Sequence, residues 1–241
     1  MQGRTAFILS NLNSLNIKLI HQFAKQNCNI ILHGHSNEEN RSRTIENEYR
    51  KDQIRFISHQ LRIISDVDKL VEKAFNYFQH IDILIINHQY RRYYRASIEE
   101  FPIEKWKECI DYDLHTTFAL VKTLWSQMKR QHFGRIIHII DEENLLGNEY
   151  QSASTTSHHA LFGLNRALSI EGKSYGITSN IIYPGLMQTN ISEEFNHIKT
   201  LSDLVLFLCT DQARSINGQS ISFDEKSLNY DVSSLALNIK E

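Results

Sequence analysis

Residues 82–140 decide the fold class, and they read DILIINHQYRRYYRASIEEFPIEKWKECIDYDLHTTFALVKTLWSQMKRQHFGRIIHII. The stretch opens and closes on short apolar runs rich in β-branched residues, at 82–87 and 135–140, which predict two buried strands. Between them, apolar residues recur at the period of an amphipathic helix, so we expect a long helix over 103–130. A strand, a helix and a second strand in this order predict a parallel βαβ unit.

The same alternation continues through the rest of the chain. Further strands are predicted at 5–9, 28–34, 53–58, 178–183 and 220–223, with helices near 15–27, 38–50, 66–79, 152–174 and 201–209. Because the strands are nearly continuous apolar runs, we expect helices on both faces of the sheet. Right-handed crossovers then predict a single doubly wound, Rossmann-like α/β domain over residues 1–241, with about seven parallel strands in the order 3-2-1-4-5-6-7.

Composition narrows the function classes. The net charge of -2, with scattered basic residues, argues against nucleic acid or a membrane surface as a partner. The three cysteines, Cys28, Cys109 and Cys209, are odd in number and lie in apolar surroundings, which indicates free thiols in a reducing compartment. With no signal peptide and no apolar run of about 18 residues, we expect a cytoplasmic protein.

Several short segments follow one another in a characteristic order: FPIEKW at 101–106, GRIIHII at 134–140, NIIYPGLMQT at 180–189 and INGQSISFD at 216–224. In this order and spacing, the chain resembles the short-chain dehydrogenase/reductase family, and within it the 3-hydroxybutyrate dehydrogenases and ketoacyl reductases. The resemblance implies an NAD(P)-dependent oxidoreductase. It also implies dimers or tetramers formed through the two longest helices, here 103–130 and 152–174.

The glycine-rich turn of that family falls on residues that are not glycine. The motif Thr-Gly-x-x-x-Gly-x-Gly corresponds to Leu9, Ser10, Ser14 and Asn16. The glycines allow the backbone to approach the pyrophosphate closely, and side chains at these positions occupy that space. We therefore expect no bound cofactor. The alternative is that the hydroxyl and amide groups bind another anion at the helix N-terminus.

The remaining cofactor positions are also degenerate. One asparagine, Asn87, is left of the family's Asn-Asn-Ala-Gly element, and Pro184 and Thr189 fall on the family's positions after the sixth strand. Together with Ser10, Ser14 and Asn16, these are the vestigial cofactor-binding positions. NAD or NADP is expected only if the chain is an active dehydrogenase.

The four catalytic positions implied by the resemblance have all changed. The tyrosine that protonates the carbonyl is Ser154, the lysine four residues on is His158, the serine is Asp141, and the asparagine of the long helix is Asp113. General acid catalysis typically contributes about 10²–10⁴ in rate, and a serine hydroxyl lacks the reach and the pKa of a phenol. A carboxylate at position 141 also opposes the negative charge that develops during reduction. Hydride transfer by the usual mechanism is therefore not expected.

The family's substrate lid is also missing from the sequence. Between the Pro184–Gly185 turn and the helix expected at 201, the segment ISEEFNHIKT at 191–200 is nearly all that remains. We expect a loop there, which leaves little to exclude water from a hydride-transfer site.

Three functional hypotheses follow. The first is a pseudoenzyme that binds a ligand or a partner subunit, either a second copy or an active relative. The second is an NAD(P)-dependent oxidoreductase with an atypical site. The third is new chemistry in the old site, either hydrolysis by Asp141, Ser154 and His158 or metal binding by His88, Asp141, His158 and His159. Twelve histidines make chance clusters common, so no metal site is predicted.

The segment from Tyr90 to Arg95, YRRYYR, follows the fourth predicted strand. It is interpreted as an exposed loop. The alternative is a site for a small anionic ligand or a partner, because arginine and tyrosine bind anions and planar rings.

Overall fold

The computed structural model describes residues 1–9, 12–34, 38–50, 52–58, 61, 64–88, 93–141, 146–185 and 191–223, and for 64–65 and 191–195 the backbone alone. The strands of this part of the chain are β1 (Thr5–Leu9), β2 (Asn29–Gly34), β3 (Ile54–Ser58), β4 (Ile83–Asn87), β5 (Gly134–Ile139), β6 (Ile177–Tyr183) and β7 (Ser220–Ser222). They form one parallel sheet in the order β3-β2-β1-β4-β5-β6-β7, which confirms the predicted topology.

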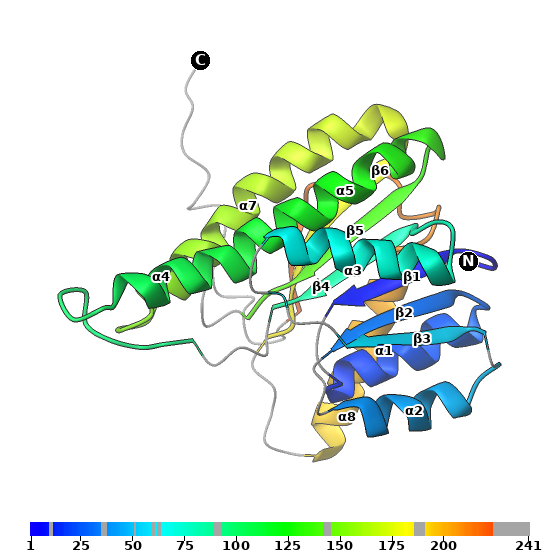
Figure 1. Cartoon of the computed structure of the whole chain (residues 1–241), viewed down its shortest axis with the longest axis horizontal. Helices are drawn as coiled ribbons and strands as arrows, with labels where there is room; N and C mark the ends of the chain where they lie inside the picture. Colours follow the sequence, from blue (N-terminus) through cyan, green and yellow to red (C-terminus); the bar gives the residue numbers. More distant parts are fainter. Residues whose placement is uncertain are drawn as a thin grey trace.

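The helices cover both faces of this sheet (Figure 1). They are α1 (Ser14–Lys25), α2 (Glu39–Asn47), α3 (Ile64–Tyr77), α4 (Ile103–Ile110), α5 (Thr116–Arg130), α7 (Ser152–Gly172) and α8 (Ile191–Leu208), with a 3₁₀ turn at Lys173–Tyr175. Helices α1, α2 and α8 lie on one face, and α3, α5 and α7 lie on the other.

The sheet is covered twice because successive strand residues point to opposite faces. Ile8 of β1 lies in the apolar layer beneath α1 and α8, whereas its neighbour Phe7 lies in the layer beneath α3 and α5. Both side chains are fully buried, which explains why the strands are apolar at nearly every position.

Helix α8 begins at Ile191, so the prediction of a loop at 191–200 was wrong. The reason lies in the spacing of buried residues: Ile198, Leu201, Val205 and Leu208 form one stripe that packs beneath the sheet. The residues between them are mainly polar, so the sequence pattern did not indicate where the helix begins.

The helix predicted over 103–130 is interrupted by a π-helical turn at Asp111–His115, between α4 and α5. Such turns insert one residue into a helix and are frequent at functional sites. The hydroxyl of Thr117, in the first turn of α5, donates to the carbonyl of Asp113 at 2.5 Å. The turn therefore fixes Asp113, one of the four catalytic positions.

Two further observations bear on the sequence-based expectations. All three cysteines are free and buried, as predicted. Among the residues that the structure describes, no helix combines the length and the apolar character needed to span a membrane.

Candidate functional site

The candidate site lies at the carboxyl ends of the central strands. Strand β1 pairs with β2 on one side and with β4 on the other, so the strand order reverses there. Ligands of open α/β sheets bind in the crevice outside such a reversal. The described residues of the turn between β1 and α1 and of the segments after β4 and β5 lie around this reversal.

In the turn, the chain's own side chains accept from backbone N–H groups that could otherwise hold a phosphate. Asn13 caps α1, and its side-chain oxygen accepts from the backbone N–H of Asn16 at 2.7 Å. The backbone N–H of Leu12 donates to a carboxylate oxygen of Glu38 at 2.6 Å. Oriented N–H groups at a helix start are what a pyrophosphate uses, and two of them are already bonded here.

The side chain of Asn16 is fully buried where the family carries its third glycine. Its side-chain oxygen accepts from the amide of Asn87 at 3.3 Å, which ties the first turn of α1 to the end of β4. That glycine normally allows close packing of the helix on the strand and access for the pyrophosphate. The residues that the structure describes in this turn therefore do not fit a dinucleotide.

Glu38 reaches the turn because Gly34, the last residue of β2, has no side chain. A Cβ atom on Gly34 would lie 2.6 Å from a carboxylate oxygen of Glu38 and 2.8 Å from Cε2 of Phe56. The carboxylate is thus folded over bare backbone to reach Leu12. Sequence reasoning did not find Glu38; the acid just ahead of the helix that follows the second strand was the available signal.

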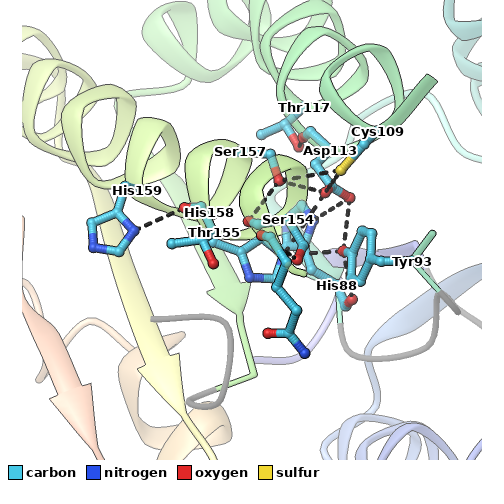
Figure 2. A network of polar contacts seen from close by, with 11 residues as sticks. His88, Tyr93, Cys109, Asp113, Thr117, Ser154, Thr155, Ser157, His158 and His159 are labelled. Carbon is cyan, nitrogen blue, oxygen red and sulfur yellow. Dashed lines mark hydrogen bonds and ion pairs between the residues drawn. The ribbon is translucent and has the colours of Figure 1, made fainter. Parts of the chain in front are cut away.

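In the π-helical turn between α4 and α5, Asp113 is the centre of a buried polar cluster (Figure 2). Its Oδ1 accepts from the hydroxyl of Tyr93 at 3.1 Å, and its Oδ2 accepts from the hydroxyl of Ser157 at 2.7 Å. Cys109 Sγ lies 3.6 Å from Oδ2. One imidazole nitrogen of His88 lies 3.8 Å from Oδ1.

These contacts keep the carboxyl of Asp113 ionised. Burial is the largest single influence and by itself raises the pKa of Asp113. The hydrogen bonds and positive potential of His88, His158 and Ser157 outweigh it, so the pKa lies below its ordinary value. A fully buried carboxylate is therefore held by the side chains around it.

Two imidazoles near this cluster, those of His158 and His138, have lowered pKa values and are neutral at pH 7. Burial lowers the pKa of His158 to about 4, although the charge of Asp113 opposes that shift. Burial, with a smaller effect of His88, lowers the pKa of His138 to about 3. Both ring nitrogens of His138, Nε2 of His88 and Nδ1 of His158 have no hydrogen-bond partner among the described residues.

The structure does not bring the proposed hydrolytic residues together. Ser154 is buried, and its hydroxyl donates to the carbonyl of Gln151 at 3.2 Å, while His158 Nε2 lies 3.0 Å from the hydroxyl of Tyr93. Asp141 is partly exposed, two residues beyond the end of β5. The hydroxyl–imidazole bond that a Ser-His-Asp mechanism needs is not formed.

Of the four residues considered for a metal site, His88 and His158 lie near each other, with ring centroids 6.0 Å apart, but His159 does not join them. His159 is exposed, points away from the cluster in Figure 2, and bonds to the carbonyl of Thr155 at 2.8 Å. Within the described parts of the chain, no group of three His, Cys, Asp or Glu residues is placed to hold a metal ion.

The remaining predicted positions are partly described. Ser14 is exposed at the first residue of α1. Pro184 is buried after β6, and its carbonyl oxygen is bonded to the imidazole of His197. Ser10, Thr189 and Tyr90 to Arg92 lie outside the described residues.

Tyr93 was predicted as part of an exposed loop, yet its hydroxyl lies in the Asp113 cluster. No spacing rule joins Tyr93 to a helix position 65 residues later. Its place directly after a strand end was the one usable signal.

Comparison with known proteins agrees with this architecture. The model of the short chain dehydrogenase family matches residues 5–199. A D-beta-hydroxybutyrate dehydrogenase of Rhizobium meliloti is 24% identical, over 92% of this chain and 97% of the relative. A 3-oxoacyl-[acyl-carrier-protein] reductase of Buchnera aphidicola is 29% identical, over 67% and 72%. A solved structure from Bacillus thuringiensis, provisionally assigned as a 3-oxoacyl-reductase, superposes with a TM-score of 0.81 at 25% identity, over 91% and 96% of the two chains.

Proposed function

This chain belongs to the short chain dehydrogenase family, and we propose that it is a member that has lost dinucleotide-dependent hydride transfer and acts by binding. One observation carries the proposal: the buried side chain of Asn16, bonded to Asn87, fills the position where the dinucleotide needs bare backbone. The bond from the N–H of Leu12 to the carboxylate of Glu38 supports it, because a carboxylate also repels phosphate.

The residues at the family's catalytic positions support the same proposal. In place of the family's tyrosine and lysine, Ser154 donates to a backbone carbonyl and His158 is neutral. In place of its asparagine, Asp113 is an ionised carboxylate with its own protein partners. A developing oxyanion would face a fixed negative charge there rather than a cation.

The binding partner that we propose is a second copy of the chain, as a dimer or tetramer, or an active relative. Phe118 on α5 is 52% exposed and Ile170 on α7 is 64% exposed, and both belong to the long helices through which the family's oligomers form. Exposed apolar side chains on a helix surface are typical of a protein contact.

A cytoplasmic location fits the free buried cysteines.

A second candidate function is an NAD(P)-dependent oxidoreductase of the 3-hydroxybutyrate dehydrogenase kind. The printed functions of the relatives favour it. It requires that the turn around Asn16 rearrange when the cofactor binds.

A small anionic ligand at the arginine-rich segment 90–95 is a further element of the binding proposal.

The experiment that separates these functions is titration with NAD(H) and NADP(H), followed by nicotinamide fluorescence and by the melting temperature. A ligand present at 100 times its Kd stabilises the folded state by about 2.7 kcal/mol, so true binding is easily detected. We expect no shift at millimolar concentration. A micromolar Kd for either cofactor would contradict the proposal and favour the oxidoreductase. An active hydroxybutyrate dehydrogenase in parallel is the positive control.

A further inference from the structure

Exposed apolar side chains gather where α4 and α7 begin. In the part of the chain that the structure describes, nine large apolar side chains are exposed, and five of them precede or begin these helices: Tyr94, Ile98, Ile103, Leu146 and Tyr150. The two segments are joined, because the backbone N–H of Ala96 donates to the carbonyl of Tyr150 at 3.3 Å. Residues 94–104 and 146–150 are called the apolar arm below, and they lie at the left of Figure 1.

The arm is held in shape within the single chain. The rings of Tyr94 and Phe101 meet edge to face with centroids 5.6 Å apart, and Phe101 meets Trp106 in the same way at 6.4 Å. Tyr150 has a backbone φ of 66°, which bulky residues rarely adopt. Strained conformations of this kind cluster at functional sites. The arm therefore presents its apolar side chains as a prearranged surface.

The arm is also acidic. Exposed glutamates directly follow or precede its apolar residues, and they are Glu99, Glu100, Glu104 and Glu149. Arg95 is the one basic residue of the arm, so four carboxylates against one guanidinium leave a net charge of −3. This charge opposes an anionic membrane surface. It favours a protein surface on which an apolar side chain lies between basic ones.

The opposite end of α7 has that chemistry. Arg166, Ile170 and Lys173 follow at intervals of four and three residues, so they share one face of the helix end. All three are exposed. Glu171, the one acidic residue between positions 166 and 173, lies about 100° away around the helix. At the same end of the molecule, the ammonium of Lys129 lies 4.1 Å from the ring centre of Tyr175 and adds positive charge.

A two-fold axis across α7 brings the arm and this basic end together. The helix begins at Ser152, beside the arm, and Ile170 lies about 27 Å further along it. When two copies pack α7 against α7 in opposite directions, each arm meets the partner's helix end. Near the midpoint, Gly163 is exposed, and a Cβ atom there would meet no described atom within 4 Å outside its own stretch of helix. The two backbones can approach closely at that point.

From these observations we propose that the apolar arm docks on the Arg166–Ile170–Lys173 face of a second copy, in a two-fold symmetric dimer. The five apolar side chains present on the order of 500 Å² of exposed surface. A stable interface buries about 800 Å² per partner, so the face of α7 must contribute the remainder. The inference rests on the binding role proposed above, and it names the partner as a second copy and the surfaces that meet.

Charge reversal in the full-length chain tests the contact. The arm variant carries Glu99→Arg and Glu104→Arg, and the helix variant carries Arg166→Glu and Lys173→Glu. Each variant alone places like charges opposite one another in both contacts of the dimer. We expect the dissociation constant of each, measured by analytical ultracentrifugation, to rise at least about tenfold over wild type.

An equal mixture of the two variants restores opposite charges in both contacts, with their signs exchanged. We expect the mixture to form a heterodimer under conditions where each variant alone is dissociated, a gain that misfolding cannot produce. The matched control carries Glu39→Arg and Glu48→Arg at the two ends of α2, which changes the net charge as the arm variant does. It is expected to keep the wild-type dissociation constant, and melting temperatures verify that each variant is folded.

The proposal is overturned if the wild-type chain is a monomer, if either variant associates as wild type does, or if the mixture stays dissociated. A wild-type dimer that survives both reversals would overturn this contact and leave the binding role intact. Tight binding of NAD(H) or NADP(H) in the titration would instead contradict the binding role, whatever the masses of these variants.

Discussion

The side-chain amide of Asn87, at the end of β4, donates to the side-chain oxygen of Asn16, in the first turn of α1, at 3.3 Å. Both side chains are buried, and 71 residues separate them in the sequence. In the family the position of Asn16 is a glycine, and the position of Asn87 faces the cofactor. Here the two residues satisfy each other, so the helix start is held to the sheet by protein rather than by a ligand.

Asn16→Ala tests whether this bond holds the helix. The variant removes the hydrogen bond that the amide of Asn87 donates to Asn16, and a hydrogen bond within a protein contributes about 0.5–1.5 kcal/mol to stability. We expect the free energy of unfolding, measured by urea denaturation, to fall by that amount. The control is Asn40→Ala on the exposed side of α2, expected to change stability by less than about 0.5 kcal/mol. Equal stability of Asn16→Ala and wild type would show that the bond is not structural.

The fold could be predicted from the sequence because its signals are local. The apolar runs at 5–9 and 135–140 have the length and β-branched content of buried strands, and the structure places strands at Thr5–Leu9 and Gly134–Ile139. Alternation with helical patterns then left one favoured topology. The beginning of α8 was missed because its buried stripe, which includes Ile198, starts within a mainly polar segment.

The candidate site could be predicted in part. Asp113 and His158 were found because they fall on the catalytic positions of the family that the sequence resembles. Glu38 and Tyr93 were not found, because each contacts a residue that is distant in the sequence. Glu38 bonds to Leu12, 26 residues away, and Tyr93 contacts His158, 65 residues away. Side chains that fold back over such segments are set by tertiary packing, which no periodicity encodes.

A double-mutant cycle between Gly34 and Glu38 tests whether the carboxylate is seated on the turn. In the wild-type background, Gly34→Ala places a methyl group 2.6 Å from Oε2 of Glu38, so the carboxylate must shift and its bond from Oε1 to Leu12 is expected to weaken. A hydrogen bond to a charged group contributes about 1.5–3 kcal/mol. We expect Gly34→Ala to cost more in wild type than in the Glu38→Ala background.

The measurement is urea denaturation of the four proteins of the cycle, and the expected coupling is at least about 1 kcal/mol. The contact of the new methyl group with Phe56 is common to both backgrounds and cancels in the cycle. Glu39→Ala, at the first residue of α2, replaces Glu38→Ala in a control cycle and is expected to give no coupling. Additive effects in the main cycle would contradict the contact between the carboxylate and the turn.

The buried histidines predict a loss of stability in mild acid. Burial lowers the pKa of His138 to about 3 and that of His158 to about 4, from an ordinary value near 6.5. Between pH 6.5 and 4, the unfolded chain therefore binds protons that the folded chain does not. Each group lowers the free energy of unfolding by up to about 1.4 kcal/mol per pH unit in this window.

The carboxyl of Asp113 affects the free energy of unfolding at lower pH than the histidines do. Its pKa is lowered on folding, so its contribution is present above the ordinary carboxyl value near 4 and is lost as the pH falls further. Urea denaturation at pH 7.5, 6, 5, 4 and 3 separates the two windows. We expect His138→Leu to flatten the slope between pH 6.5 and 4. An unchanged slope in His138→Leu would contradict a neutral buried imidazole.

The exposed apolar residues of the long helices predict the surface of self-association. Phe118 on α5 and Ile170 on α7 are more than half exposed, and a stable interface buries about 800 Å² per partner. A carboxylate in such an interface is desolvated without a partner, so Phe118→Glu and Ile170→Glu are expected to dissociate the oligomer. Light scattering after gel filtration should then give the 28.2 kDa of one chain. Phe207→Glu is the matched control: Phe207 is 44% exposed on α8, which covers the other face of the sheet from α5 and α7, so this variant should keep the wild-type mass. A wild-type protein that is already monomeric would remove self-association from the proposed function and leave an active relative as the partner to be sought.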